Sequence, residues 1–159
     1  MAERRSRLPF LIALFAAPAI LGAAASLFAL MGEYGTRFAV AGAFGLLAVL
    51  PAWFLVFPWL AWRDPLADGW KPRVKTSLAA NFASLVIYPA LIVLLVATGN
   101  YEAMFPAAGT EGAVAEFAEN PVPRDAALIS AIMAFMLGLV FMPMLAALFT
   151  WVERRATRL

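Results

Sequence analysis

Four long apolar stretches dominate the chain, and none of them contains an Asp, Glu, Lys, Arg or His residue. They run over residues 8–30, 38–62, 77–97 and 126–151. With a helical rise of about 1.5 Å per residue, each stretch is long enough to cross the ~30 Å hydrocarbon core of a bilayer. The pattern predicts an all-α integral membrane protein with four transmembrane helices, forming a single membrane domain over residues 1–159.

The charged residues lie outside these stretches, and their signs predict the topology. The N-terminal segment, the second connection and the C-terminal tail carry ten basic and four acidic residues, a net charge of +6. The first and third connections carry two basic and six acidic residues, a net charge of −4. Because Lys and Arg stay on the cytoplasmic side, both termini are predicted to be cytoplasmic. The first connection is short, so an up-down-up-down bundle in the bacterial inner (plasma) membrane is the simplest expectation.

Basic residues beside the predicted spans are expected to contact anionic lipid headgroups on the cytoplasmic side, which attract juxtamembrane Lys and Arg. The expected contacts are Arg63, Lys71, Arg73, Lys75, Arg154 and Arg155. Tryptophans accompany them, and indole rings favour the headgroup boundary. The basic segments are short and scattered, so no nucleic-acid partner is predicted.

Composition removes several kinds of chemistry. The chain has no Cys and no His, which excludes disulfides, thiol nucleophiles and the usual ligands of haem, zinc and copper. No phosphate-binding glycine loop, HExxH or GxSxG motif is present, and no acid–base pair is evident. Neither catalytic residues nor a metal or cofactor site is predicted.

Each stretch also contains a pair of small residues four apart, which allow helices to approach closely within a membrane. The pairs are Gly22 and Ser26, Ala41 and Gly45, Ala79 and Ala83, and Ala134 and Gly138. Every stretch contains proline as well, and a mid-helix proline such as Pro18 frees a carbonyl that a neighbouring helix must satisfy. Trp53 lies near the middle of its stretch, either as a packing residue or as the wall of a ligand cavity.

Asn81, Ser84 and Tyr88 occupy one face of the third stretch, because residues three and seven apart share a helical face. An amide is costly in hydrocarbon, so this face should turn inward. The stripe either forms hydrogen bonds between helices or lines a solute path, which Ser130 could also face. Outside the membrane, the connection over residues 98–125 contains a candidate amphipathic helix over 111–120, whose acidic groups are a solvated face, a docking surface for a periplasmic partner or a substrate gate.

These observations predict a small non-catalytic membrane protein, a subunit or assembly partner of a larger membrane complex. Its predicted partners are the bilayer and other membrane subunits or further copies of itself. The alternative is a small permease, or the membrane component of a solute transporter, with a polar path along the third stretch. A membrane-embedded enzyme is the third possibility, disfavoured because no nucleophile–base or acid–base pair can be placed together.

Overall fold

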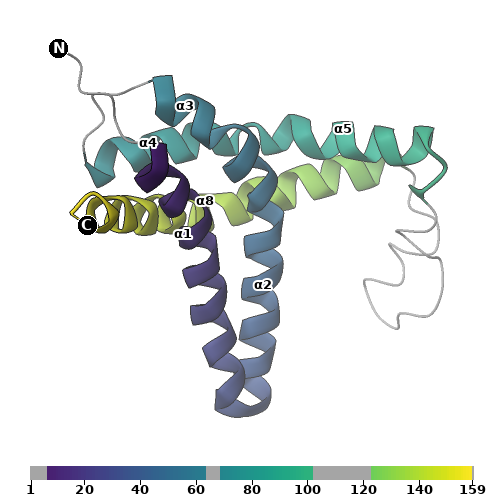
Figure 1. Ribbon diagram of the computed structural model, residues 1–159. Helices are drawn as coiled ribbons and strands as arrows, with labels where there is room; N and C mark the ends of the chain where they lie inside the picture. The colour runs from purple at the N-terminus through teal and green to yellow at the C-terminus, as the bar shows by residue number, and fades with distance from the viewer. Residues whose placement is uncertain (1–6, 64–68, 102–122, 159) are drawn as a thin grey trace.

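A computed structural model of the chain describes residues 7–63, 69–101 and 123–158, and all regular secondary structure within these ranges is helical (Figure 1). Three continuous helical stretches in this described part are long and apolar enough to cross a membrane, namely Leu8–Leu55, Trp70–Ala97 and Pro123–Ala156. The chain is therefore a helical membrane protein. The predicted amphipathic helix over 111–120 lies outside the described residues.

The helical stretch Leu8–Leu55 is a hairpin, which we call the arm. It consists of α1 (Arg7–Leu27), the 3₁₀ turn η1 (Phe28–Met31) and α2 (Gly32–Leu55). Gly32 has a φ of +84°, a conformation that favours glycine, and it follows the turn at the arm's tip. α2 begins at Gly32, so most of the predicted connection between residues 30 and 38 is helical. An i,i+4 ion pair between Glu33 and Arg37 stabilises this first part of the helix.

The helix breaks after α2 because of a proline. The short helix α3 (Phe57–Arg63) begins one residue beyond Val56, and Pro58 lies in its first turn. Proline has no amide hydrogen and its ring clashes with the preceding turn, so it favours a helix start over a helix interior.

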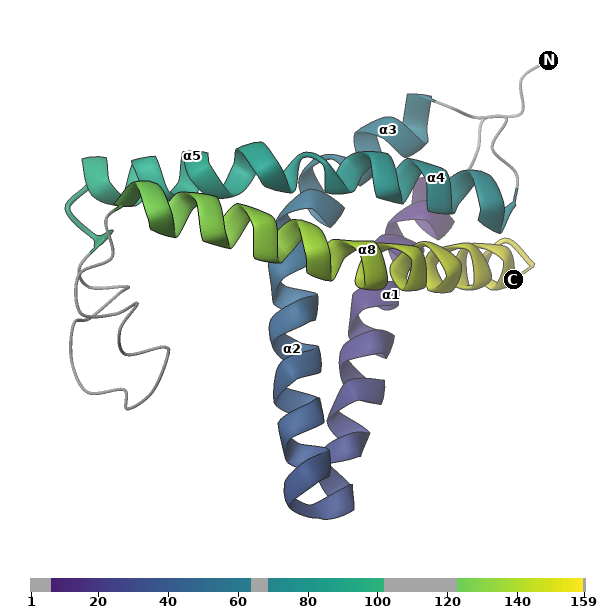
Figure 2. The same cartoon turned by 180° about the vertical axis from the view of Figure 1, so that it is seen from behind.

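The helical stretch Trp70–Ala97 consists of two helices, α4 (Trp70–Asn81) and α5 (Ser84–Ala97), separated by a turn at Phe82 and Ala83. α4 begins well before residue 77, where the uninterrupted apolar stretch starts. The last helix, α8 (Pro123–Ala156), runs antiparallel to α4 and α5 along their length (Figures 1 and 2).

The arm crosses the α4–α5 and α8 pair instead of running beside it (Figures 1 and 2). Only the base of the arm, where α1 begins and α2 ends, reaches the other helices, and the tip projects away from them. This arrangement does not confirm the predicted four-span count or the up-down-up-down bundle. α8 acts as the spine of the fold, since it contacts α1, α2, α4 and α5.

The main hydrophobic core lies where the base of the arm meets α8. Its aromatic side chains interlock: Trp53 stacks on Phe57 with ring centroids 4.1 Å apart, and Phe149 contacts Phe10 edge-on at 5.1 Å. Trp53, Phe57 and Phe149 are fully buried. Aromatic pairs of this kind add about 0.5–1.5 kcal/mol beyond the area that they bury.

Candidate functional site

A row of buried polar side chains runs along one face of α4 and into α5, and we call it the polar seam. It consists of Arg73, Ser77, Asn81 and Ser84, each at most 1% exposed. The spacing of three to four residues places them on the same helical face, and the contacts of Arg73 and Asn81 show that this face meets α8. The inward orientation expected for Asn81 is confirmed by its complete burial.

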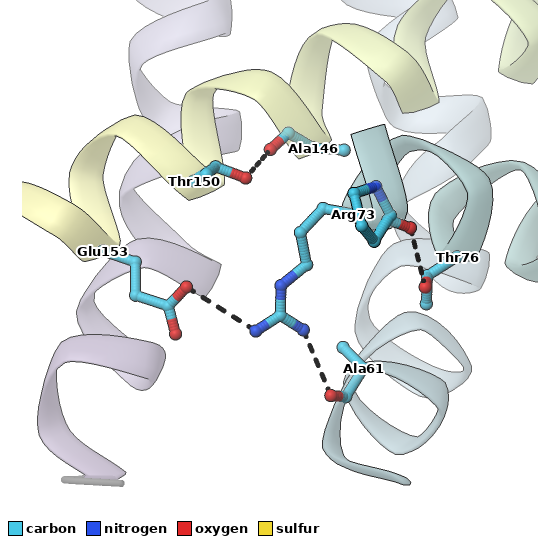
Figure 3. A network of polar contacts seen from close by, with 7 residues as sticks. Ala61, Arg73, Thr76, Ala146, Thr150 and Glu153 are labelled. Carbon is cyan, nitrogen blue, oxygen red and sulfur yellow. Dashed lines mark hydrogen bonds and ion pairs between the residues drawn. The ribbon is translucent and has the colours of Figure 1, made fainter. Parts of the chain in front are cut away.

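Arg73 lies at one end of the seam and joins three helices (Figure 3). One guanidinium nitrogen, Nη1, donates a 3.1 Å hydrogen bond to the carbonyl of Ala61 in the last turn of α3. The other, Nη2, lies 3.7 Å from Oε2 of Glu153 on α8. The guanidinium also lies 5.4 Å from the centre of the Phe149 ring. The last carbonyls of a helix have no partner inside the helix, so Arg73 caps α3 while it pairs with α8.

The prediction that Arg73 contacts lipid headgroups is therefore wrong in this structure, since the side chain is 1% exposed and points inward. The physical reason is the length of α4. Its helix starts at Trp70, and position 73 falls on the face that carries Ser77 and Asn81. A glutamate on α8 then supplies the charge that a buried arginine needs.

Asn81 joins α4 to α8 in the middle of the seam. Its Nδ2 donates a 2.9 Å hydrogen bond to the carbonyl of Phe135. Its amide fits against Gly138, where an added Cβ would overlap the Asn81 side chain. The predicted small pair on this helix, Ala134 and Gly138, is buried, so the absence of side-chain bulk on α8 makes room for a polar group from α4.

The other residues of the predicted polar path have different partners. The Tyr88 hydroxyl donates a 2.6 Å hydrogen bond to the carbonyl of Ala48 and so joins α5 to α2. Ser130 bonds to Ala127 within its own helix. Asn81 Oδ1 and Ser84 Oγ are buried and have no hydrogen-bond partner within the described part of the chain. The structure thus brings Asn81 and Ser84 into one buried seam, while Tyr88 and Ser130 bond elsewhere.

Trp53 connects the two helices of the arm. Its indole Nε1 donates a 3.0 Å hydrogen bond to the carbonyl of Leu14. Pro18 lies four residues after Leu14 and has no amide hydrogen to donate to that carbonyl. The indole replaces the missing donor, and this explains why a tryptophan lies deep in an apolar stretch.

The remaining small residues divide between buried and exposed positions. Gly45 is buried, and a Cβ there would overlap the ring of Phe141. A Cβ added at Gly22 would lie 3.4 Å from Leu46 Cδ2, an ordinary van der Waals distance. Ala83 is half-buried. Ser26, Ala41 and Ala79 are exposed, so no helix in the described part of the chain covers them.

The other basic residues expected at lipid headgroups are exposed, as such contact requires: Arg63, Lys71, Lys75, Arg154 and Arg155. Among the described residues, no group of three or more Asp and Glu side chains is placed to hold a metal ion. The chain matches no protein-family model, no curated protein and no solved structure.

Sequence reasoning missed two members of the seam, Arg73 and Ser77. The signal was present in the sequence, because the polar face of Asn81 and Ser84 continues backwards at steps of four residues through both positions. The hydrogen bond of Trp53 also had a signal in Pro18, whose freed carbonyl required a donor from a neighbouring helix.

Proposed function

We propose that this protein is a small non-catalytic subunit or assembly partner of a larger membrane complex in the bacterial inner membrane. The observation that carries the proposal is the distal part of the arm, which is apolar and has no further helix of the described residues against it (Figure 1). Its exposed large side chains include Leu27, Phe28, Leu30, Phe38 and Phe44.

Small residues on the arm favour a protein partner in addition to lipid. Ala23, Ala24, Ala41 and Ala43 are all exposed. Exposed alanines allow a second helix to approach closely, and membrane helices associate mainly through such contact. The buried polar groups support the same proposal, because Asn81 of the polar seam bonds to α8 and Tyr88 of α5 bonds to α2.

The proposal includes four spans with both termini in the cytoplasm, supported by the charge difference between the connections. Crossed hairpins cannot both lie along the bilayer normal, and both are apolar enough to span. Four spans therefore require the arm to rotate on α8 when lipid surrounds it. The ion pair of Glu33 and Arg37 would then reach the headgroups on the outer side.

Spin-label distances in lipid nanodiscs test this rotation. Labels at Tyr34→Cys and Leu128→Cys lie on the arm tip and on the first turns of α8, both at exposed positions. The proposal predicts that the two labels come close together in nanodiscs. A control pair at Val93→Cys and Leu128→Cys, on the packed α5 and α8, should keep its distance. A tip label that stays far from α8 would contradict four spans.

Affinity purification after gentle solubilisation tests the partner. Ala41→Leu adds bulk to the exposed face of the arm and should remove the co-purifying membrane subunit. Ala79→Leu is the matched control, since Ala79 is equally an exposed alanine but lies on α4. Identical protein profiles for the wild type and Ala41→Leu would contradict a partner on this face.

A permease is the second candidate, and one observation favours it. Asn81 Oδ1 and Ser84 Oγ are buried and unbonded beside the break between α4 and α5, and broken helices with free polar groups form the binding sites of many transporters. The double variant Ser84→Ala, Tyr88→Phe removes two hydroxyls with little change of shape. If the protein alone moves solute across vesicles and this variant stops the flux, the permease replaces the subunit proposal.

A further inference from the structure

The last turns of α8 and the first turn of α4 enclose a pocket of about 340 Å³, which we call the basic pocket. Its walls are two tryptophans and three arginines: Trp70, Trp151, Arg154, Arg155 and Arg158. Arg154 and Arg155 lie in the last turn of α8, Arg158 lies in the turn that follows it, and all three are exposed. Their charges are thus gathered on the side of the helix that faces Trp70.

No acidic side chain of the described residues neutralises these arginines. Glu153 is the adjacent carboxylate on α8, and it points toward Arg73 at 3.7 Å (Figure 3). Arg155 lies 5.2 Å from the centre of the Trp151 ring, a cation–π contact that orients the guanidinium without cancelling its charge. Within the described residues, the lining of the pocket is therefore positively charged.

Two further residues that line the pocket, Thr150 and Ala147, do not offer a side-chain hydrogen-bond donor to a ligand. The Thr150 hydroxyl donates to the carbonyl of Ala146 at 2.8 Å and is directed back into its own helix. Ala147 lines the pocket with a methyl group only. The charged groups of the lining are thus the guanidiniums, while the two tryptophans add apolar ring surface and indole N–H donors, and Ala147 adds a methyl group.

We propose that the basic pocket binds the headgroup of one anionic phospholipid from the cytoplasmic leaflet. The proposal rests on the proposed membrane orientation, which places this end of α8 at the cytoplasmic surface. Guanidinium groups bind phosphate through paired hydrogen bonds. Indole rings suit the glycerol level of the bilayer, and basic pockets between helices hold anionic headgroups. Arg158 joins the site although the sequence pattern did not single it out.

A second pocket at the base of the arm provides a comparison within the same molecule. It has a volume of about 630 Å³ and is lined by apolar side chains, including Phe10, Leu14 and Trp62. Among the described residues one arginine, Arg63, lines it and lies 4.4 Å from the centre of the Trp59 ring. Hydrocarbon can fill such a pocket whatever the headgroup charge, so selectivity for anionic lipid should belong to the basic pocket alone.

Native mass spectrometry in detergent tests the proposal by counting lipids bound to the full chain. We expect one tightly bound phosphatidylglycerol and at least roughly tenfold weaker binding of phosphatidylcholine with the same acyl chains. The double variant Arg154→Gln, Arg158→Gln should reduce phosphatidylglycerol binding roughly tenfold, to the level of phosphatidylcholine. The matched control, Arg63→Gln, Lys75→Gln, removes the same charge elsewhere and should keep the lipid.

Three results would overturn the proposal. Equal binding of the two lipids would show that the pocket does not select charge. An equal loss in the control variant would show that only the diffuse surface charge attracts lipid. Displacement of the lipid by millimolar inorganic phosphate would show a soluble-anion site. All exchanged residues are exposed, so melting temperatures should not change. A variant that loses the lipid but keeps its membrane partner in the pull-down would show that this site and the proposed function fail independently.

Discussion

The arm and the α4–α5/α8 pair are both apolar hairpins, but they are stabilised differently. Within the described ranges, the distal part of the arm packs on itself, through close approaches such as Gly42 against Ala25. The α4–α5/α8 pair has a polar seam in which Arg73 and Asn81 bond to α8. Hydropathy alone makes the two hairpins look equivalent. The comparison shows that directional polar bonds, far fewer than the apolar contacts, specify which helices pair.

The largest loss of unfolding free energy is expected when the Arg73–Glu153 pair is broken in the α4–α5/α8 hairpin. Glu153→Leu leaves a guanidinium that is 1% exposed without this carboxylate. Removing one partner of a buried ion pair costs about 3–5 kcal/mol, and the part-exposed Glu153 places the loss toward the lower end. Equilibrium unfolding in detergent micelles measures it.

Two controls sharpen this result. Arg37→Gln removes the exposed ion pair at the arm tip, and exposed pairs contribute only about 0.2–1 kcal/mol. The double variant Arg73→Met, Glu153→Leu should be more stable than Glu153→Leu alone, because no guanidinium then remains buried without the Glu153 carboxylate. Equal losses at the tip and in the seam would mean that the polar seam does not distinguish the hairpins.

The next largest effect is expected at Trp53, which joins the base of the arm. Trp53→Phe removes the donor to the Leu14 carbonyl, and a buried acceptor left unbonded costs about 1–3 kcal/mol. Pro18→Ala should restore the helical donor to that carbonyl. The loss of unfolding free energy from Trp53→Phe should therefore be smaller in the Pro18→Ala background. Additive losses would show that the indole acts only by filling space.

A pair of identical glycine substitutions compares the two hairpins directly. Gly138→Ala places a Cβ on the Asn81 amide, and such overpacking costs about 1–3 kcal/mol. Gly22→Ala adds the same methyl to the arm, where the nearest atom outside its own helix, Leu46 Cδ2, lies at 3.4 Å. There the higher helix propensity of alanine should raise stability by up to about 1 kcal/mol. Adding Asn81→Ala to Gly138→Ala should relieve the overlap, and unchanged instability would exclude Asn81 as its cause.

The sequence was sufficient for the helical membrane class, for the burial of Asn81 and for close packing at Gly45 and Gly138. The four-residue spacing also places Arg73 on the face of Ser77 and Asn81, but it does not identify Glu153, because the spacing is the same whether that face meets lipid or a glutamate 80 positions later in the chain. The sequence also did not predict that the two hairpins cross. An apolar helix surface accepts lipid or another helix with similar energy, so hydropathy does not encode the angle between hairpins.

The smallest predicted effect is at Tyr88, and it separates a structural role of the Tyr88 hydroxyl from a role in a solute path. Tyr88→Phe removes the hydroxyl that bonds to Ala48, and hydrogen bonds between membrane helices contribute about 0.6 kcal/mol on average. The control is Tyr34→Phe on the exposed arm tip, where the side chain is 77% exposed and no change in stability is expected. Unfolding in micelles should resolve the two variants. If Tyr88→Phe is as stable as the wild type, the hydroxyl does not join α5 to α2, and its place beside the broken helix then supports the permease.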